Sequence, residues 1–407
     1  MFPARVAAIL MLLVGFGLAV AAFSAACLPR LHAPRSAAVD VLPLWLGAGL
    51  VLQGRDPLDP ALAEAQFRAE QLPLRPGGFY SYYPPTASVL ALPLRALDFR
   101  GAVGVVRWGG ALATPLGVAL AAAAAFPRRR RPAGVWMAAV GLWLAAGAML
   151  ARPARVVLAT GQIGPWVVLA LGAALFLLAR GRSGWAGVVA GGGAALKVAG
   201  VVLLPALLWR GGRRGAAAFL VVPVLSVGVL LALGAPLRPV DWLLSVMDFA
   251  GRELPPSPQL AGAGVGQLLA ARGFLAGGGF LAAGAVLAWR GRGRALNERE
   301  AVGLAAAGST ALGLLLAGSA HPHEALVALP GVAYALAWPM AVPRRLALAS
   351  GGALLAVVLL TPEAFAAEGP RESLNWLPIA ALAHVVAVLR VAMGGEEGDR
   401  GGWGAAP

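Results

Sequence analysis

The sequence predicts an all-α polytopic membrane protein, a bundle of about 12 transmembrane helices with one large extracytoplasmic loop near the N-terminus. Three observations support this fold class. Hydrophobic residues make up 59% of the 407 residues, charged residues only 13%, and the mean hydropathy is +0.77. Soluble domains carry about 25% charged residues. The apolar residues form long blocks, and short arginine clusters separate those blocks.

The apolar blocks have the length that a membrane requires. Examples are residues 6–26, 108–126, 163–179 and 215–233. Each meets or approaches the roughly 20 residues that a helix needs to cross the hydrocarbon core. Blocks of this length and uniformity are too long for a soluble core, so we expect each to be a span.

The arginine clusters predict the orientation of the helices. They comprise residues 128–131, Arg180 with Arg182, Arg210 with Arg213 and Arg214, several arginines in 290–299, and Arg344 with Arg345. The positive-inside rule places all of them in the cytoplasm. The formal net charge is +15. Because the charge sits in short clusters and not on a continuous basic face, nucleic-acid binding is not expected.

Two segments do not fit simple crossings. A single helix over 184–209 would leave Arg182 and Arg210 on opposite sides of the membrane, so we expect two short helices that meet near Lys197. Residues 84–97 are too short to span and begin with Pro84-Pro85, so we expect them along the outer surface. Both termini are then cytoplasmic.

The resulting topology is one transmembrane domain over 1–394 with a short disordered cytoplasmic tail over 395–407. The main outer loops are expected at 28–100, 151–160, 235–265, 319–323 and 362–373. Loop 28–100 is the large one, and we expect juxtamembrane helices in it. It holds Tyr82 and Tyr83 in the run Tyr82-Tyr83-Pro84-Pro85. Such tyrosines are also typical of an aromatic belt at the membrane interface.

Lys197 is the only lysine in the chain and lies deep in apolar sequence. An ionisable group in such a segment is costly unless it faces a cavity or a partner, which favours a functional role. Snorkelling toward an interface is the alternative. An ammonium group there would suit the phosphate of a lipid-linked substrate.

Asp40 follows the first span and has apolar neighbours on both sides. A carboxylate held against the membrane surface can have its pKa raised toward the working range of a general base. A solvated loop aspartate is the equally common alternative.

Gln162 and two upstream arginines, Arg152 and Arg155, precede the block at 163–179. The glutamine could simply be a polar group at the end of a helix. Arginines on the outer side run against the positive-inside trend, which indicates an anionic ligand near them.

His321 and His323 flank a proline in His321-Pro322-His323-Glu324. Zinc prefers such ligands, but this spacing does not match a helical His-Glu-x-x-His motif and no second cluster supplies the remaining ligands. We therefore expect no metal, and hydrogen bonding at the rim of a site is the preferred role.

The order of these features resembles glycosyltransferase family 87, the polyprenol-phosphate-mannose-dependent α-mannosyltransferase group of the GT-C membrane superfamily. The resemblance covers roughly residues 35–335. The features that carry it, in chain order, are Asp40 after the first span, Leu52-Gln53-Gly54-Arg55-Asp56-Pro57-Leu58, Tyr82-Tyr83-Pro84-Pro85 before Leu92-Pro93-Leu94, Gly161-Gln162 before an apolar span, and the segment ending at Lys197.

The resemblance implies a GT-C-type bundle that moves a sugar, most often mannose, from a polyprenyl-phosphate donor to a lipid or glycan acceptor at the extracytoplasmic face of the plasma membrane. It implies that Asp40 is the base and that the anomeric carbon is inverted. The donor phosphate would be bound by Lys197, with Arg152 or Arg155 as alternatives. Tyr82, Tyr83, Gln162, His321 and His323 would line the substrate site. No cofactor is required.

A multi-spanning transporter or lipid flippase is the main alternative from another class. It would share the span number and the lysine within the membrane. Transporters often show two related halves, and no such symmetry is visible in this sequence. A purely structural membrane scaffold is the third alternative, and Asp40 and Lys197 argue against it.

Overall fold

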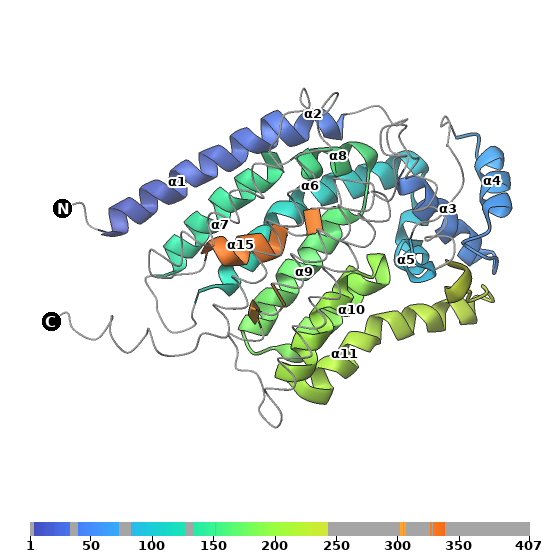
Figure 1. Ribbon diagram of the computed structural model, residues 1–407. Coiled ribbons are helices and arrows are strands. Elements are labelled where there is room, and N and C mark those ends of the chain that lie inside the picture. Colours follow the sequence, from blue (N-terminus) through green and yellow to red (C-terminus); the bar gives the residue numbers. More distant parts are fainter. Residues whose placement is uncertain are drawn as a thin grey trace, which may run out of the picture.

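The computed structural model describes residues 4–32, 40–72, 83–126, 133–150, 152–242, and near the C-terminus 302–303, 305–306, 326–327 and 329–337. These residues are mostly helical and contain no β-strand (Figure 1). Three of their helices are long and apolar enough to cross a membrane, or four if one bent pair forms a single span. They agree with an all-α membrane protein, and a count of about 12 is not tested by them.

The first span is one long helix with a π turn in it. α1 covers Ala4–Ala22, the π turn η1 covers Phe23–Cys27, and α2 covers Leu28–Leu31. Pro29 lacks an N–H group and its ring collides with the carbonyl four residues earlier. A π turn immediately before α2 accommodates this proline. The helix therefore continues past Pro29 and ends at Leu31, beyond the predicted block.

Short helices lie within residues 28–100, the segment expected to be the large loop. They are α3 (Val41–Leu52), α4 (Pro60–Ala69), α5 (Pro85–Leu90) and the 3-10 helix η3 (Leu92–Ala96). Asp59 caps α4 by accepting hydrogen bonds from the backbone N–H groups of Ala61 and Leu62. α5 has only 6 residues, which gives a length of about 9 Å. The segment 84–97 therefore does not cross a membrane.

The middle of the chain forms four helices, namely α6 (Phe99–Ala124), α7 (Ala133–Leu150), α8 (Arg152–Thr160) and α9 (Gly164–Ala179), and α6 packs against both α7 and α9. α8 corrects the expectation of a loop at 151–160, because this segment is helical; the axes of Ala138–Leu150 and Ala154–Thr160 differ by 60°. α6 also begins nine residues before the apolar block at 108–126.

The chain breaks at Lys197, as predicted. α10 covers Ser183–Lys197, the 3-10 helix η4 covers Ala199–Leu203, and α11 covers Leu204–Ala232. A Cβ placed on Gly200 would lie 1.8 Å from the backbone oxygen of Ala190. The segment after Lys197 therefore returns along α10, backbone against backbone.

α11 reverses direction near its start. A Cβ on Gly215 would lie only 3.0 Å from the backbone oxygen of Leu207, whereas eight residues of straight helix span about 12 Å. The continuation packs closely on α10, since a Cβ on Gly187 would lie 2.4 Å from the Gly215 oxygen. The arginine clusters that contain Arg182 and Arg213 consequently lie at the same end of the helices, as the positive-inside argument requires.

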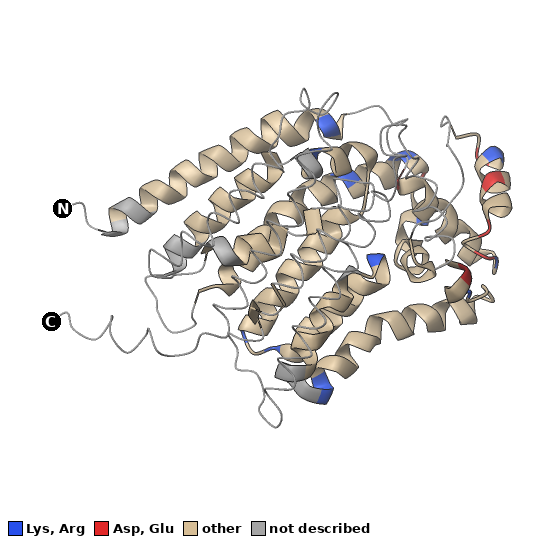
Figure 2. Cartoon of the chain, in the orientation of Figure 1, with Lys and Arg blue, Asp and Glu red and all other residues tan. Residues whose placement is uncertain are grey.

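The two ends of the bundle differ in charge. The arginine end, where α9 ends and α10 begins, carries Arg180 and Arg182. Figure 2 shows basic but no acidic residues there, and both signs at the loop end, which holds α3, α4 and α5. The C-terminal part of α11 reaches the loop end, where Leu230 and Ala235 pack with Val51 and Val89. Charges are sparse along the lengths of the helices between these ends (Figure 2).

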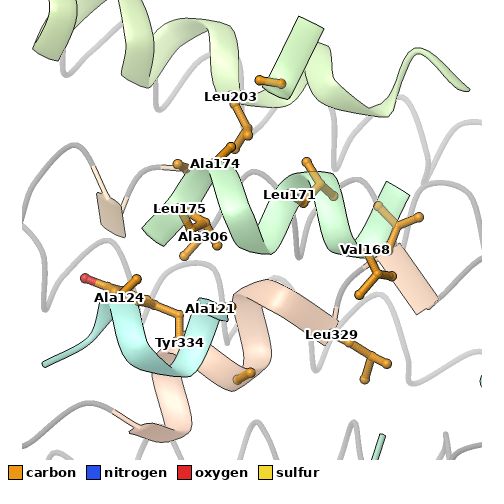
Figure 3. Packing of buried hydrophobic residues seen from close by; sticks show 14 of the residues in the cluster. Ala121, Ala124, Val168, Leu171, Ala174, Leu175, Leu203, Ala306, Leu329 and Tyr334 are labelled. Carbon is orange, nitrogen blue, oxygen red and sulfur yellow. The ribbon is translucent and has the colours of Figure 1, made fainter. Parts of the chain in front are cut away.

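The core is centred on α9. Leu171 and Leu175 of α9 are fully buried and pack with residues of α6, of η4 and of α15 (Leu329–Ala337) (Figure 3). α6 and α9 touch through their backbones, because a Cβ on Gly172 would lie 1.9 Å from the Gly117 oxygen. Small residues allow such close approach between membrane helices.

The remaining topology predictions fall mostly outside the described residues. They concern the outer loops at 235–265, 319–323 and 362–373 and the tail over 395–407. The division into one domain over 1–394 also stays a prediction.

Candidate functional site

Four segments that are distant in sequence meet at the loop end of the bundle. They share one apolar cluster, which we call the junction cluster. Its buried members are Leu44, Ala48, Tyr83, Ala87, Ala91 and Ile163, and Leu92, Leu94, Trp166 and Leu196 pack against them. The junction cluster therefore joins α3, α5, the start of α9 and the end of α10. Each of these segments carries one predicted site residue: Asp40, Tyr83, Gln162 and Lys197.

Asp40 lies at the N-terminus of α3, directly before two buried residues, Val41 and Leu42. Its backbone N–H donates to the carbonyl of Thr160 at 3.2 Å, which attaches this residue to the end of α8. The carboxylate does not cap its own helix, although aspartate is among the residues preferred for that role. The side chain is half-buried. The structure thus places Asp40 next to the connection between α8 and α9.

Gln162 lies in that connection and is buried. Gly161 has φ +73°, a left-handed conformation that glycine adopts without a steric penalty. The turn directs the Gln162 N–H back to the carbonyl of Val157 at 2.9 Å. Ile163 then enters the junction cluster. The sharp turn after α8 brings Gln162 to the same end of the bundle as Asp40.

Tyr83 is buried at the start of the Pro84-Pro85 helix entry. Pro85 occupies the first helical position of α5, where the missing N–H group has no cost. At the next position, the Thr86 hydroxyl donates to the backbone carbonyl of Ala195 at 2.7 Å. This hydrogen bond fixes α5 to the last turn of α10, two residues before Lys197.

Lys197 is the last residue of α10 and is partly buried. A cation at a helix C-terminus interacts favourably with the helix dipole, which is a structural reason for this position. The next residue, Val198, has φ +58°. A β-branched residue in this region is an outlier, and such strain concentrates at functional sites.

The other predicted residues are less completely described. Arg155 lies on α8, and its Nε atom is buried without a hydrogen-bond partner among the described residues. The backbone of Arg152 begins α8, but its side chain lies outside the described structure. Tyr82, His321 and His323 lie outside the described residues altogether. Leu326, three residues after His323, lies beside Gly164, with its Cδ2 atom 3.6 Å from the position of a Cβ there.

Two residues near the site were missed from sequence. Thr86 has no signal beyond its place after Pro84-Pro85. Arg107 is buried and donates from its guanidinium to the carbonyl of Ala159. Apolar residues on both sides of Arg107 could have indicated its burial, but the predicted apolar block began one residue later, at Trp108.

In the part of the chain that the structure describes, no group of three His, Cys, Asp or Glu side chains could hold a metal ion. A cavity of about 330 Å³ is lined by Phe176, Leu177, Arg180 and Arg182. It lies at the arginine end of α9, opposite Gln162.

The described helices and the site at one end of their bundle define the class: an α-helical membrane protein with polar residues gathered at a helix junction. The chain belongs to glycosyltransferase family 87, whose sequence profile matches residues 80–319, more than half of its length. It is therefore a membrane glycosyltransferase. No curated protein and no solved structure matches the chain.

The family match includes most of the predicted site. It contains Tyr83, Arg155, Gln162 and Lys197, together with Tyr82 and Arg152. It begins after Asp40 and ends before His321 and His323.

Proposed function

We propose that this glycosyltransferase moves a sugar, mannose in view of the family resemblance, from a polyprenyl-phosphate donor to a lipid or glycan acceptor. The proposed site is the loop end of the bundle, on the extracytoplasmic side of the plasma membrane. The observation that supports it best is the junction cluster, around which the segments carrying Asp40, Tyr83, Gln162 and Lys197 pack.

The proposed reaction is a single displacement. A hydroxyl oxygen of the acceptor attacks the anomeric carbon, and its proton passes to the Asp40 carboxylate. The bond between the anomeric carbon and the phosphate oxygen breaks, and polyprenyl phosphate leaves with the bonding electrons. Because attack and departure occur on opposite faces, the anomeric configuration inverts. The donor has one phosphate, so the chemistry does not require a metal.

Lys197 is the proposed partner of the leaving phosphate. An ammonium group near the departing oxygen stabilises the negative charge that develops in the transition state. The end of α10 suits this role, since it lies at the loop end and is fixed there by the hydrogen bond from Thr86 to Ala195. Arg155 and Arg152 of α8 are the alternatives.

Substrate binding is assigned to the surrounding polar side chains. Tyr82 and Tyr83 would shape the sugar site at the start of α5, and Gln162 would bind a sugar hydroxyl. His321 and His323 would contact the acceptor or phosphate.

The test is sugar transfer by the purified protein in lipid nanodiscs, with polyprenyl-phosphate-mannose as donor and a membrane lipid extract as acceptor source. Asp40→Asn is expected to reduce transfer by at least about a hundredfold, within the range of general-base contributions. Asp59→Asn is the matched control. It makes the same chemical change in the same loop, and asparagine caps a helix as well as aspartate does.

Full transfer by Asp40→Asn would refute the base assignment. No transfer from polyprenyl-phosphate-mannose by the parent protein, with transfer from a nucleotide sugar instead, would refute the donor class. Equal losses in Asp40→Asn and Asp59→Asn would show that the loop fold, and not the Asp40 carboxylate, limits activity.

A further inference from the structure

Arg107 is a buried cation within a helix that is long and apolar enough to span a membrane. It is only 2% exposed, and it lies on α6, whose length and composition over Phe99–Ala124 suit a membrane crossing. Its position is about 12 Å along the axis from Phe99. A charged side chain at such a place is costly and normally marks a functional element.

The guanidinium contacts the end of α8. Its Nη2 atom donates to the carbonyl of Ala159, one residue before the carbonyl of Thr160 that accepts from the Asp40 N–H. The last four carbonyls of an α-helix have no partner within the helix. Arg107 and Asp40 therefore donate hydrogen bonds to adjacent carbonyls at the C-terminus of α8.

A role limited to capping α8 does not explain why this residue is an arginine. A neutral donor would satisfy the Ala159 carbonyl without the free-energy cost of burying a full positive charge. The negative end of α8 offsets part of this cost. A carboxylate beside the same helix end gives a further reason for a cation, since a guanidinium that is fixed by a backbone carbonyl can hold a neighbouring negative charge in place.

We propose that Arg107 is a positioning residue for Asp40. It holds the end of α8 in the place where Thr160 binds the Asp40 backbone, and its charge keeps the carboxylate oriented toward the acceptor. This inference rests on the proposed role of Asp40 as the base. It gives Arg107 no contact with the donor.

The experiment compares Arg107→Met and Arg107→Lys with the parent protein in nanodiscs, and measures kcat, KM for polyprenyl-phosphate-mannose and the melting temperature. Misplacement of a catalytic group can reduce the rate about a hundredfold. We expect Arg107→Met to lower kcat by about that factor with KM changed by less than about threefold, as for an interaction made in the transition state. Arg107→Lys keeps the charge and is expected to recover part of kcat.

Thr114→Val is the matched control on the same helix. Thr114 is as buried as Arg107, and its hydroxyl has no hydrogen-bond partner among the described residues. Valine has nearly the same shape and removes a buried hydroxyl without a partner, so kcat is expected to stay unchanged and the melting temperature is not expected to fall.

A double-mutant cycle separates the two proposals. Asp40→Asn alone tests the base, while adding Arg107→Met to it tests the positioning. If Arg107 acts through Asp40, the second substitution lowers the residual kcat by less than about threefold. A full hundredfold loss in the Asp40→Asn background, or unchanged kcat in Arg107→Met, would overturn the inference while leaving the base assignment intact. If Arg107→Met does not fold, Arg107→Lys decides: a raised KM with unchanged kcat would contradict positioning.

Discussion

The hydroxyl of Thr86 donates a hydrogen bond to the backbone carbonyl of Ala195, 2.7 Å away and 109 residues later in the chain. It connects the short helix after Tyr83-Pro84-Pro85 to the last turn of α10. Because Lys197 ends that turn, the large loop and the hairpin at Lys197 form one structural unit. Both irregular segments of the sequence thus contribute to the same junction.

Replacing Thr86 by valine is expected to loosen this unit. The substitution removes the hydroxyl and leaves the Ala195 carbonyl without that donor, which costs about 1–3 kcal/mol for a buried acceptor. We expect a lower melting temperature in detergent and weaker donor binding. Thr86→Ser keeps the hydroxyl and is the control. Identical behaviour of the valine and serine variants would show that the hydrogen bond does not support the site.

Gly172→Ala is expected to destabilise the core contact between α6 and α9. A Cβ at this position would lie 1.9 Å from the Gly117 oxygen, so the backbones must separate. Overpacking of this kind typically costs about 1–3 kcal/mol. Thermal unfolding in detergent measures the change. Gly104→Ala of α6 is the control, because no atom lies within 4 Å of the added methyl group there. The packing account fails if both variants melt at the parent temperature.

Val198→Gly is expected to stabilise the turn after Lys197. A left-handed conformation costs a non-glycine residue about 1–2 kcal/mol, of which the greater flexibility of glycine in the unfolded chain offsets about 0.5–1 kcal/mol. Val201→Gly is the matched control. Val201 is 44% exposed and Val198 is 42% exposed, but Val201 has no positive φ, so its replacement should lower the melting temperature. Equal losses in both variants would contradict strain at Val198.

The sequence was sufficient to predict the fold class and several irregular segments. Uniform apolar blocks predicted helices at 163–179 and 215–233, which correspond closely to α9 and to the apolar part of α11. The break at Lys197 followed from two arginine clusters that had to share one side. These features are predictable because membrane insertion depends on composition and charge, which are local properties of the sequence.

Other features depend on tertiary packing and were not predictable from local pattern. α8 lies in a segment that the predicted topology treated as an outer loop; as a helix it presents its C-terminal carbonyls to Asp40 and Arg107. Arg107 was overlooked because a single arginine beside an apolar block is usually interfacial. Only contacts across the fold distinguish such a residue from a buried one.

The sequence suggested candidate site residues but not their geometry. Asp40, Gln162 and Lys197 were selected because polar groups are unusual in their apolar surroundings. Their common location at the junction cluster required the turn at Gly161 and the packing of α5 on α10. Neither the turn nor the packing has a distinctive sequence pattern.

Equilibrium binding of a polyprenyl-phosphate-sugar to the Lys197→Met protein tests the central claim most directly, namely that the end of α10 forms the donor site beside Asp40. The account predicts that Lys197→Met lowers donor affinity by at least about tenfold, equivalent to about 1.4 kcal/mol. Lys197→Arg should retain most of the affinity, and Asp40→Asn should bind the donor nearly as the parent does. Parental donor affinity in Lys197→Met would contradict the account.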